Sequence, residues 1–192
     1  MKKMMENNNN SFFGKDIHYL FSDYSKIDEE FVKKFDCGND YINNYFERDA
    51  LDDTKGVTRI IWKINSDKIK TDIIAMYTLS ASAMFYELDD RRYIIPAIEI
   101  KMFAVNNKYQ NLPYSKNNED GVFSDWLMCY VIRRIRDITE NYCGAEKIIL
   151  FSVPNAVSFY ERNLFEKIEY KGIDLLEILD GCIAMMFDLN EK

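Results

Sequence analysis

YIIPAIEIKMFAVNNKYQ, from Tyr93 to Gln110, changes from an apolar to a polar stretch at Asn106. The apolar part predicts a long strand from Tyr93 to Val105, because β-branched and aromatic residues favour extended backbone. Pro96 has no N–H to donate to a ladder, so it is expected at an edge, a start or a bulge of this strand. The polar part continues to Gly121 and predicts a loop. A long strand followed by a long loop therefore stands in the middle of the chain.

Toward the C-terminus, apolar residues keep a helical period from Ser124 to Tyr142 and predict a long helix. Gly144 is expected to end it, because glycine readily takes the left-handed conformation of a helix C-cap. The segments that follow are shorter. They predict, in order, a buried strand from Lys147 to Val153, a helix from Pro154 to Asn163, and two strands, Phe165 to Tyr170 and Cys182 to Leu189.

Toward the N-terminus, the pattern predicts a strand, two helices and a hairpin. In order these are a strand from Lys15 to Phe21, a helix from Asp28 to Phe35, a helix capped by Asn39 or Asp40, and paired strands from Val57 to Ile64 and from Asp72 to Ser80. The whole order is β, α, α, β, β, β, α, β, α, β, β. It indicates an α/β chain of the α+β kind, with one domain over residues 15–192 after a flexible polar tail at residues 1–14.

The composition is that of an acidic globular protein. Apolar residues make up 47% of the chain and aromatic residues 15%, which is enough for a substantial core. Lys and Arg number 25 against 32 Asp and Glu, so the net charge of −7 opposes docking onto nucleic acid or anionic lipid. No stretch approaches the roughly 18 apolar residues of a membrane helix. We therefore expect a cytoplasmic protein with no membrane partner.

The cysteines do not form a metal-binding or disulfide pattern. Four of them lie far apart, with no CxxC pair and a single histidine in the chain to complete a metal set: Cys37, Cys129, Cys143 and Cys182. We interpret them as free thiols in a reducing compartment and expect no metal.

Four stretches carry a resemblance to a known family. They are FDCGNDYINNYFERDA (Phe35 to Ala50), AMYTLSAS (Ala75 to Ser82), KMFAVNNKYQ (Lys101 to Gln110) and NAVSFYERNLFEKI (Asn155 to Ile168). Together with the order of elements, they resemble the GNAT superfamily of CoA-dependent N-acetyltransferases, and especially its small bacterial toxins. The resemblance implies the GNAT fold, a central mixed and mostly antiparallel sheet flanked by helices, with acetyl-CoA as cosubstrate.

The resemblance also implies where acetyl-CoA is held. In GNAT folds the central strand splays from its neighbour, so the backbone N–H groups of Phe103, Ala104 and Val105 are expected to face the pantetheine and the thioester carbonyl. The family's phosphate loop reads Gln or Arg, two free positions, Gly, one free position, then Gly or Ala. Here Gln110 is kept, whereas proline and serine replace the glycines.

This degenerate loop weakens the expected phosphate site. Pro113 has no N–H to offer, so Tyr114 and Ser115 are expected to supply the amides, with Lys108 or Lys116 adding positive charge. The inserted segment KNNEDG, residues 116–121, brings Glu119 and Asp120 near the place where anionic phosphates are expected.

Three further residues are candidates for the chemistry by the same resemblance. Tyr160 matches the family tyrosine that donates a proton to the departing thiolate, although it also reads as a packing residue of its helix. Asn155 matches a family residue that hydrogen-bonds the pantetheine or orders a nearby water, and otherwise serves as a cap or turn residue. Glu99 lies where some GNAT enzymes place a base for the amine; pairing with Lys101 on the same strand face would give it a structural role instead.

The resemblance leaves several functions open. The first is transfer of acetyl to an amine, which belongs to a small molecule, to a protein lysine or N-terminus, or to the amino acid on a charged tRNA, as in the toxin relatives. The acidic balance disfavours tRNA. The second is a GNAT-shaped interaction module that has lost efficient transfer through its altered loop. A growth-arresting toxin with an antitoxin is the third, and a homodimer is expected from the family.

One cationic cluster has no role in the family resemblance. Arg133, Arg134 and Arg136 fall within the predicted long helix and are suited to contact RNA or a phosphate. On an amphipathic helix, the same pattern is usually a solvated face.

Overall fold

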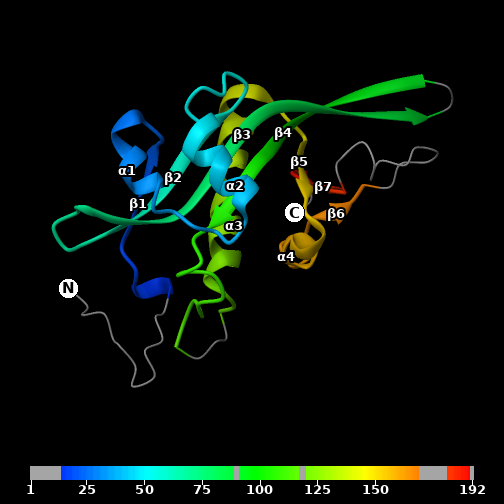
Figure 1. The fold of residues 1–192 in the computed structure, drawn as a ribbon. Coiled ribbons are helices and arrows are strands. Elements are labelled where there is room, and N and C mark those ends of the chain that lie inside the picture. Colours follow the sequence, from blue (N-terminus) through cyan, green and yellow to red (C-terminus); the bar gives the residue numbers. More distant parts are fainter. Residues whose placement is uncertain (1–13, 89–90, 117–119, 169–180, 191–192) are drawn as a thin grey trace. The chain divides into compact units, whose positions relative to one another are not determined.

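A computed structural model describes residues 14–88, 91–116, 120–168 and 181–190 (Figure 1). The chain forms two compact units. Unit 1 comprises Met1–Thr78 and Met102–Leu127, and unit 2 comprises Leu79–Lys101 and Met128–Lys192. The single domain predicted over residues 15–192 stays a prediction. Of the predicted tail, only Gly14 is described, and it is buried, with its N–H donating to the carbonyl of Pro113 at 2.9 Å.

The sheet has the predicted mixed and mostly antiparallel character. Its strand order is β1-β2-β3-β4-β5-β7-β6. Strand β4 pairs with β5 in parallel, whereas β1 with β2, β5 with β7 and β6 with β7 are antiparallel. The strands are β1 Tyr19–Asp23, β2 Val57–Ile64, β3 Lys70–Leu88, β4 Arg91–Val105, β5 Lys147–Ser152, β6 Glu166–Lys167 and β7 Ile183–Asp188.

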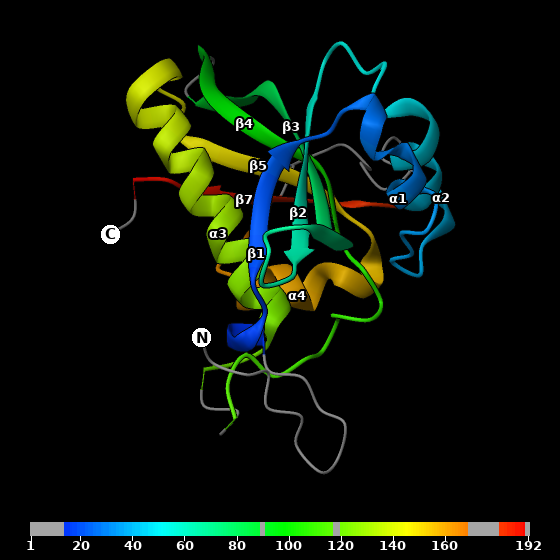
Figure 2. The same cartoon turned by 90° about the vertical axis from the view of Figure 1, so that its left-hand side faces the viewer.

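In unit 1, the helices α1 (Glu29–Val32) and α2 (Asp40–Asn44) lie beside each other (Figure 2). Asn39 caps α2 as predicted, because its side-chain oxygen accepts from the N–H of Ile42 at 3.2 Å. A π-helical turn, Tyr45–Asp49, follows and buries Phe46 edge-on against Phe35, with ring centroids 6.0 Å apart. Helix α1 is shorter than the predicted helix, which ran to Phe35.

The core of unit 1 is built around the strands β2 and β3. Trp62 is fully buried and packs edge-on against Phe31, at 5.2 Å between ring centroids. The ammonium of Lys70 lies over the indole of Trp62 at 4.2 Å and pairs with the buried carboxylate of Asp28 at 2.8 Å. This pairing compensates the desolvation of Asp28, whose charge would otherwise be costly to bury.

Helix α3 (Phe123–Ile138) passes from unit 1 into unit 2 and continues as a π-helical turn, Thr139–Cys143. Gly144 ends it with a φ of 62°, as predicted. In unit 2, Val131 and Ile135 of α3 are fully buried. The short helix α4 (Val157–Arg162) follows a 3-10 turn, Pro154–Ala156, with proline at its start.

Strand β7 lies between β5 and β6 in this chain's own sheet. It pairs with β5 from Lys147↔Asp188 to Ser152↔Ile183 and so confirms the predicted strand from Cys182 to Leu189. The predicted strand from Phe165 to Tyr170 is reduced to β6, and its last two residues lie outside the described part of the chain.

Strands β3 and β4 are longer than predicted. Strand β3 runs on from Ser80 to Leu88, and β4 begins at Arg91 rather than at Tyr93. The two strands run side by side as a ribbon (Figure 1). Its side chains include the exposed Phe85 and Ile94. Within the described residues, no helix is long and apolar enough to cross a membrane.

Candidate active site

The parallel pairing of β4 with β5 ends early. It covers Ala97↔Lys147 to Glu99↔Ile149, although β4 continues to Val105 and β5 to Ser152. On its other edge, β5 pairs with β7 along its whole length, from Lys147 to Ser152. An early end to the pairing of β4 with β5 is what the expected splay of the central strand requires.

Glu99 lies at the last paired position of β4 and is half-buried. Its Oε2 accepts a hydrogen bond from the hydroxyl of Ser80 on β3 at 3.2 Å. A neutral hydroxyl donor orients the carboxylate without cancelling its charge, so the carboxylate keeps acceptor capacity for an amine proton. The predicted pairing with Lys101 stays a prediction.

Tyr160 is buried on α4, with a side-chain exposure of 9%. Its ring meets Phe159 and Phe165 edge-on, at centroid distances of 5.1 and 5.7 Å. Burial raises the pKa of the hydroxyl above the ordinary tyrosine value, so the hydroxyl stays protonated at neutral pH. Among the described residues, none is hydrogen-bonded to this hydroxyl, and its proton is therefore not committed to a structural acceptor.

Asn155 lies on the 3-10 turn that leads into α4 and is exposed. The turn is closed by the N–H of Ala156, which donates to the carbonyl of Val153 at 2.9 Å. Unit 2 thus contains Glu99, Asn155 and Tyr160, whereas the other predicted site residues belong to unit 1.

In unit 1, hydrogen bonds from two residues hold the backbone at the end of β4. Ala104 and Val105 are buried and Phe103 is half-buried. The N–H of Asn106 donates to the carbonyl of Ile74 at 2.9 Å, and the carbonyl of Val105 accepts from the side chain of Gln110 at 2.7 Å. These bonds fix the backbone at the point where the resemblance places the thioester.

Gln110 acts as a clamp between two loops. Its Nε2 donates to the carbonyl of Val105 and, at 3.0 Å, to the carbonyl of Cys37. Both amide hydrogens are therefore used within the protein, and only the carboxamide oxygen remains for another partner. In this arrangement Gln110 holds the loop in place. A direct hydrogen bond from Gln110 to a phosphate requires at least one of these two bonds to break.

Some amides of the degenerate loop are bonded within the loop itself, whose residues 117–119, including the predicted Glu119, lie outside the described part of the chain. The N–H of Tyr114 donates to the carbonyl of Gly121 at 2.9 Å, and Pro113 forms a β-bridge with Val122. The ring of Tyr114 stacks on Trp126 at 5.7 Å. Ser115 is buried. The predicted amide of Tyr114 is thus already bonded within the loop.

Charge near the loop is also partly neutralised. Lys108, predicted to add positive charge, pairs with Asp72 at 3.0 Å, and the N–H of Phe123 at the start of α3 donates to the carbonyl of Leu112 at 2.8 Å. Asp125 lies in the first turn of the same helix. A helix N-terminus attracts anions through unpaired amides, so this one is a weak phosphate site.

Sequence reasoning missed a carboxylate that organises the same region. Asp36 accepts from the N–H of Gly38 at 2.8 Å and from the side-chain amides of Asn43 at 3.0 Å and Asn107 at 3.1 Å. These donors, the Gly38 N–H first, lower the pKa of Asp36. Gly38 and Asn43 are near Asp36 in the sequence, but Asn107 lies 71 residues away, so no local motif reveals the whole cluster.

In the described part of the chain, no three metal-binding side chains (His, Cys, Asp or Glu) gather at one place. The sequence matches no protein-family model and no curated protein.

Solved structures of bacterial toxins have the same fold. One is described only as a bacterial toxin; it is 17% identical, with a TM-score of 0.63 over 90% of this chain and 92% of that chain. AtaT, complexed with acetyl-methionyl-tRNAfMet, is 13% identical, with a TM-score of 0.62 over 89% and 95%. A tyrosine-to-phenylalanine mutant of KacT is 12% identical, with a TM-score of 0.65 over 88% and 94%. The chain therefore has the fold of these toxins, which is the GNAT fold predicted from its sequence.

Proposed function

We propose that the protein is an N-acetyltransferase that moves acetyl from acetyl-CoA to an amine by direct attack. The observation that carries this proposal is the buried, protonated hydroxyl of Tyr160, which has no acceptor among the described residues. The fold supports it, since AtaT has been solved with acetyl-CoA. Tyrosine-to-phenylalanine mutants of AtaT and KacT have also been solved.

The proposed step needs one proton donor and one proton acceptor. The amine nitrogen attacks the thioester carbonyl carbon, a C–N bond forms, and the C–S bond breaks with its electron pair moving to sulfur. Tyr160 donates its proton to that sulfur, while Glu99, directly or through water, takes the proton that the amine loses. The backbone N–H groups around Ala104 are the proposed donors to the carbonyl oxygen.

The test combines binding and turnover. Acetyl-CoA at about 100 times its dissociation constant is expected to add about 2.7 kcal/mol of stability and to raise the melting temperature by several degrees. Tyr160→Phe is expected to keep this shift and to lower kcat on an amine panel by about 100-fold or more. Turnover that survives Tyr160→Phe contradicts the assigned role.

Tyr24→Phe is the matched control. Tyr24 is equally buried, at 9% exposure, and its hydroxyl also lacks a partner among the described residues, but it belongs to the core of unit 1. Loss of the Tyr24 hydroxyl is expected to leave kcat unchanged.

A second candidate is an interaction module without efficient transfer. The bonded amide of Tyr114, the clamped Gln110 and the pairing of Lys108 favour it, because all three reduce the capacity for phosphate. The absence of any thermal shift at millimolar acetyl-CoA would support this alternative.

For the acceptor, the AtaT complex with acetyl-methionyl-tRNAfMet supports an aminoacyl-tRNA, whereas the net charge of −7 favours a small amine or a protein. Structures of AtaT with the C-terminus of the antitoxin AtaR support the toxin hypothesis. Growth arrest on expression, relieved by a co-expressed partner, is the expected behaviour of a toxin; normal growth argues against it.

A further inference from the structure

Glu99, the proposed base, is a charged residue in an apolar part of β4. Ala97, Ile98 and Ile100 around it are buried, and Ile149, its partner in the parallel pairing with β5, is buried too. A carboxylate in such a place loses part of its hydration, which is costly unless a hydrogen-bond donor compensates. The nature of that donor therefore affects what the carboxylate can do.

The donor is Ser80, on the neighbouring strand β3. Every residue of β3 from Ile73 to Leu79 is buried, and Ser80 is the half-buried residue that follows them. Its hydroxyl donates to Oε2 of Glu99 at 3.2 Å. Because both residues lie within paired strands of one sheet, strand pairing rather than a loop fixes the position of the donor.

A fixed donor matters because a glutamate side chain is flexible. Holding it in one conformation costs much rotamer entropy, so an unsupported carboxylate samples several positions. A serine hydroxyl is separated from the backbone by a single side-chain torsion and has little freedom of its own. The bond from Ser80 therefore restricts Glu99, and the second carboxylate oxygen, Oε1, is not engaged by this bond.

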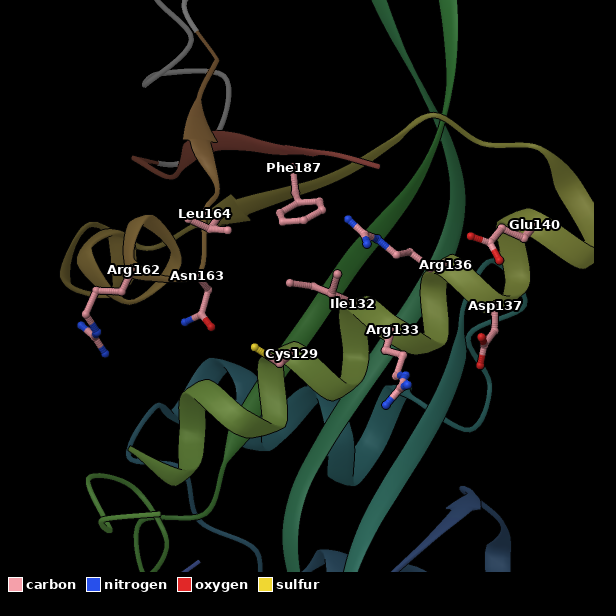
Figure 3. Close-up of a pocket in the computed structure, with 10 residues that line it drawn as sticks. All are labelled: Cys129, Ile132, Arg133, Arg136, Asp137, Glu140, Arg162, Asn163, Leu164 and Phe187. Carbon is pink, nitrogen blue, oxygen red and sulfur yellow. The ribbon is translucent and has the colours of Figure 1, made fainter. Parts of the chain in front are cut away.

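Two other carboxylates of unit 2 lie among cationic side chains instead. Asp137 and Glu140, on α3 and the turn that continues it, line a cavity of about 570 Å³ together with Arg133 and Arg136 (Figure 3). Asp137 is paired with Arg134 at 3.2 Å. A cationic partner stabilises the charged form of a carboxylate and makes it a poorer proton acceptor. A carboxylate held by a neutral hydroxyl is better suited to take a proton from an amine.

We propose that Ser80 is a positioning residue of the transfer reaction, which holds Oε2 of Glu99 so that Oε1 faces the amine of the acceptor. The inference rests on the proposed role of Glu99 as the base. In this step Oε1 takes the proton that the amine loses and passes it to water after the acetylated product has formed. Ser80 keeps its own proton throughout, so its contribution is geometric.

The kinetic test is the substitution Ser80→Ala. It is expected to lower kcat on the amine panel about tenfold, because misplaced reacting groups lose rate steeply, and to leave the KM for acetyl-CoA unchanged. Ser80→Thr is expected to restore the rate, since threonine keeps the hydroxyl and suits a strand. Ser82→Ala is the matched control, because Ser82 lies two residues further along β3 and is also half-buried. Melting temperatures check that every variant folds.

A double mutant separates positioning from a structural role. If Ser80 acts through the carboxylate, Ser80→Ala changes kcat less than about twofold once Glu99→Gln has removed the base. If Ser80 only supports the fold, the losses of the two single mutants multiply. Multiplied losses overturn the proposal, and so does a Ser80→Ala variant that keeps the full kcat of the wild type; in both cases the transfer reaction itself stands.

Crystal structures without substrate separate this proposal from the proposed function. In Ser80→Ala the carboxylate of Glu99 is expected to move or to take several positions, and in Ser80→Thr to stay where it is in the wild type. If the wild type acetylates no amine but the carboxylate moves as expected, the transfer is wrong and the positioning stands. A carboxylate that stays in place without the Ser80 hydroxyl overturns the proposal, whatever the activity.

Discussion

Leu164 has a φ of 67°, in the left-handed region that glycine adopts far more readily than leucine. We expect Leu164→Gly to raise the free energy of unfolding by up to about 1 kcal/mol, because relief of the left-handed strain outweighs the entropy that glycine adds to the unfolded chain. Urea unfolding measures the change.

Leu164→Ala is the control for this prediction, since alanine keeps the β-carbon and hence the strain. A stabilisation of equal size in both variants would mean that exposure of the leucine, rather than its backbone conformation, sets the cost.

Tyr160 predicts the shape of the pH profile. Burial raises its pKa above the ordinary value of about 10, so the hydroxyl remains protonated across the neutral and mildly alkaline range. As the pH rises, the acceptor amine loses its proton, and kcat is expected to rise to a plateau without an alkaline decline below about pH 10. A decline near neutral pH that disappears in Tyr160→Phe would contradict this.

Among the elements, β5 and β7 are joined by an ion pair between Lys147 and Asp188, whose side chains are mostly buried. The hydrogen bond from Lys147 lowers the pKa of Asp188. A lowered pKa contributes stability that is present above the unfolded value, near 3.9, and is lost as the pH falls through the folded value.

Asp188→Asn is therefore expected to cost about 0.5–1 kcal/mol at pH 7 and less at pH 2, because the wild-type carboxylate takes up a proton as the pH falls through its lowered pKa. Chemical denaturation at the two pH values measures both. A cost that is equal at pH 7 and pH 2 would show that packing, not charge, holds this end of the strand pair.

Among the side chains of its loop, Gln110 donates to two backbone carbonyls, and Gln110→Ala tests how much these bonds contribute. The carbonyls of Val105 and Cys37 lose a donor, so the free energy of unfolding is expected to fall by about 1–2 kcal/mol in the absence of any ligand. Unchanged stability, with weaker acetyl-CoA binding, would return Gln110 to the phosphate role that its sequence position suggests.

Periodicity and cap residues predicted most of the elements, as the left-handed Gly144 and the Asn39 cap illustrate. The ribbon of β3 and β4 was underestimated, because Ser80 to Ala83 are small residues with no clear strand alternation. For the site, a local motif predicted Tyr160 as the proton donor, and this role stays a prediction. The partners of Gln110 and Asp36 could not be predicted, because hydrogen bonds across 71 to 73 residues depend on tertiary packing.

For the whole molecule, the two compact units share three continuous elements, β3, β4 and α3. We expect them to unfold in one cooperative transition. Both tryptophans, Trp62 and Trp126, belong to unit 1, so tryptophan fluorescence reports that unit, and amide exchange in β5 and β7 reports unit 2. Coincident urea midpoints support the single predicted domain, whereas separated midpoints support two.

The position of β7 affects how the protein is made on the ribosome. All residues of unit 1 have been translated once residue 127 is complete, but β5 must wait for β7, some 30 residues further along the chain, before its second edge is paired. At synthesis rates of about 5–20 residues per second, this leaves an apolar strand exposed for a few seconds on every nascent chain. Chaperones are expected to bind this strand mainly in that interval. Slow codons between β5 and β7 would lengthen the interval.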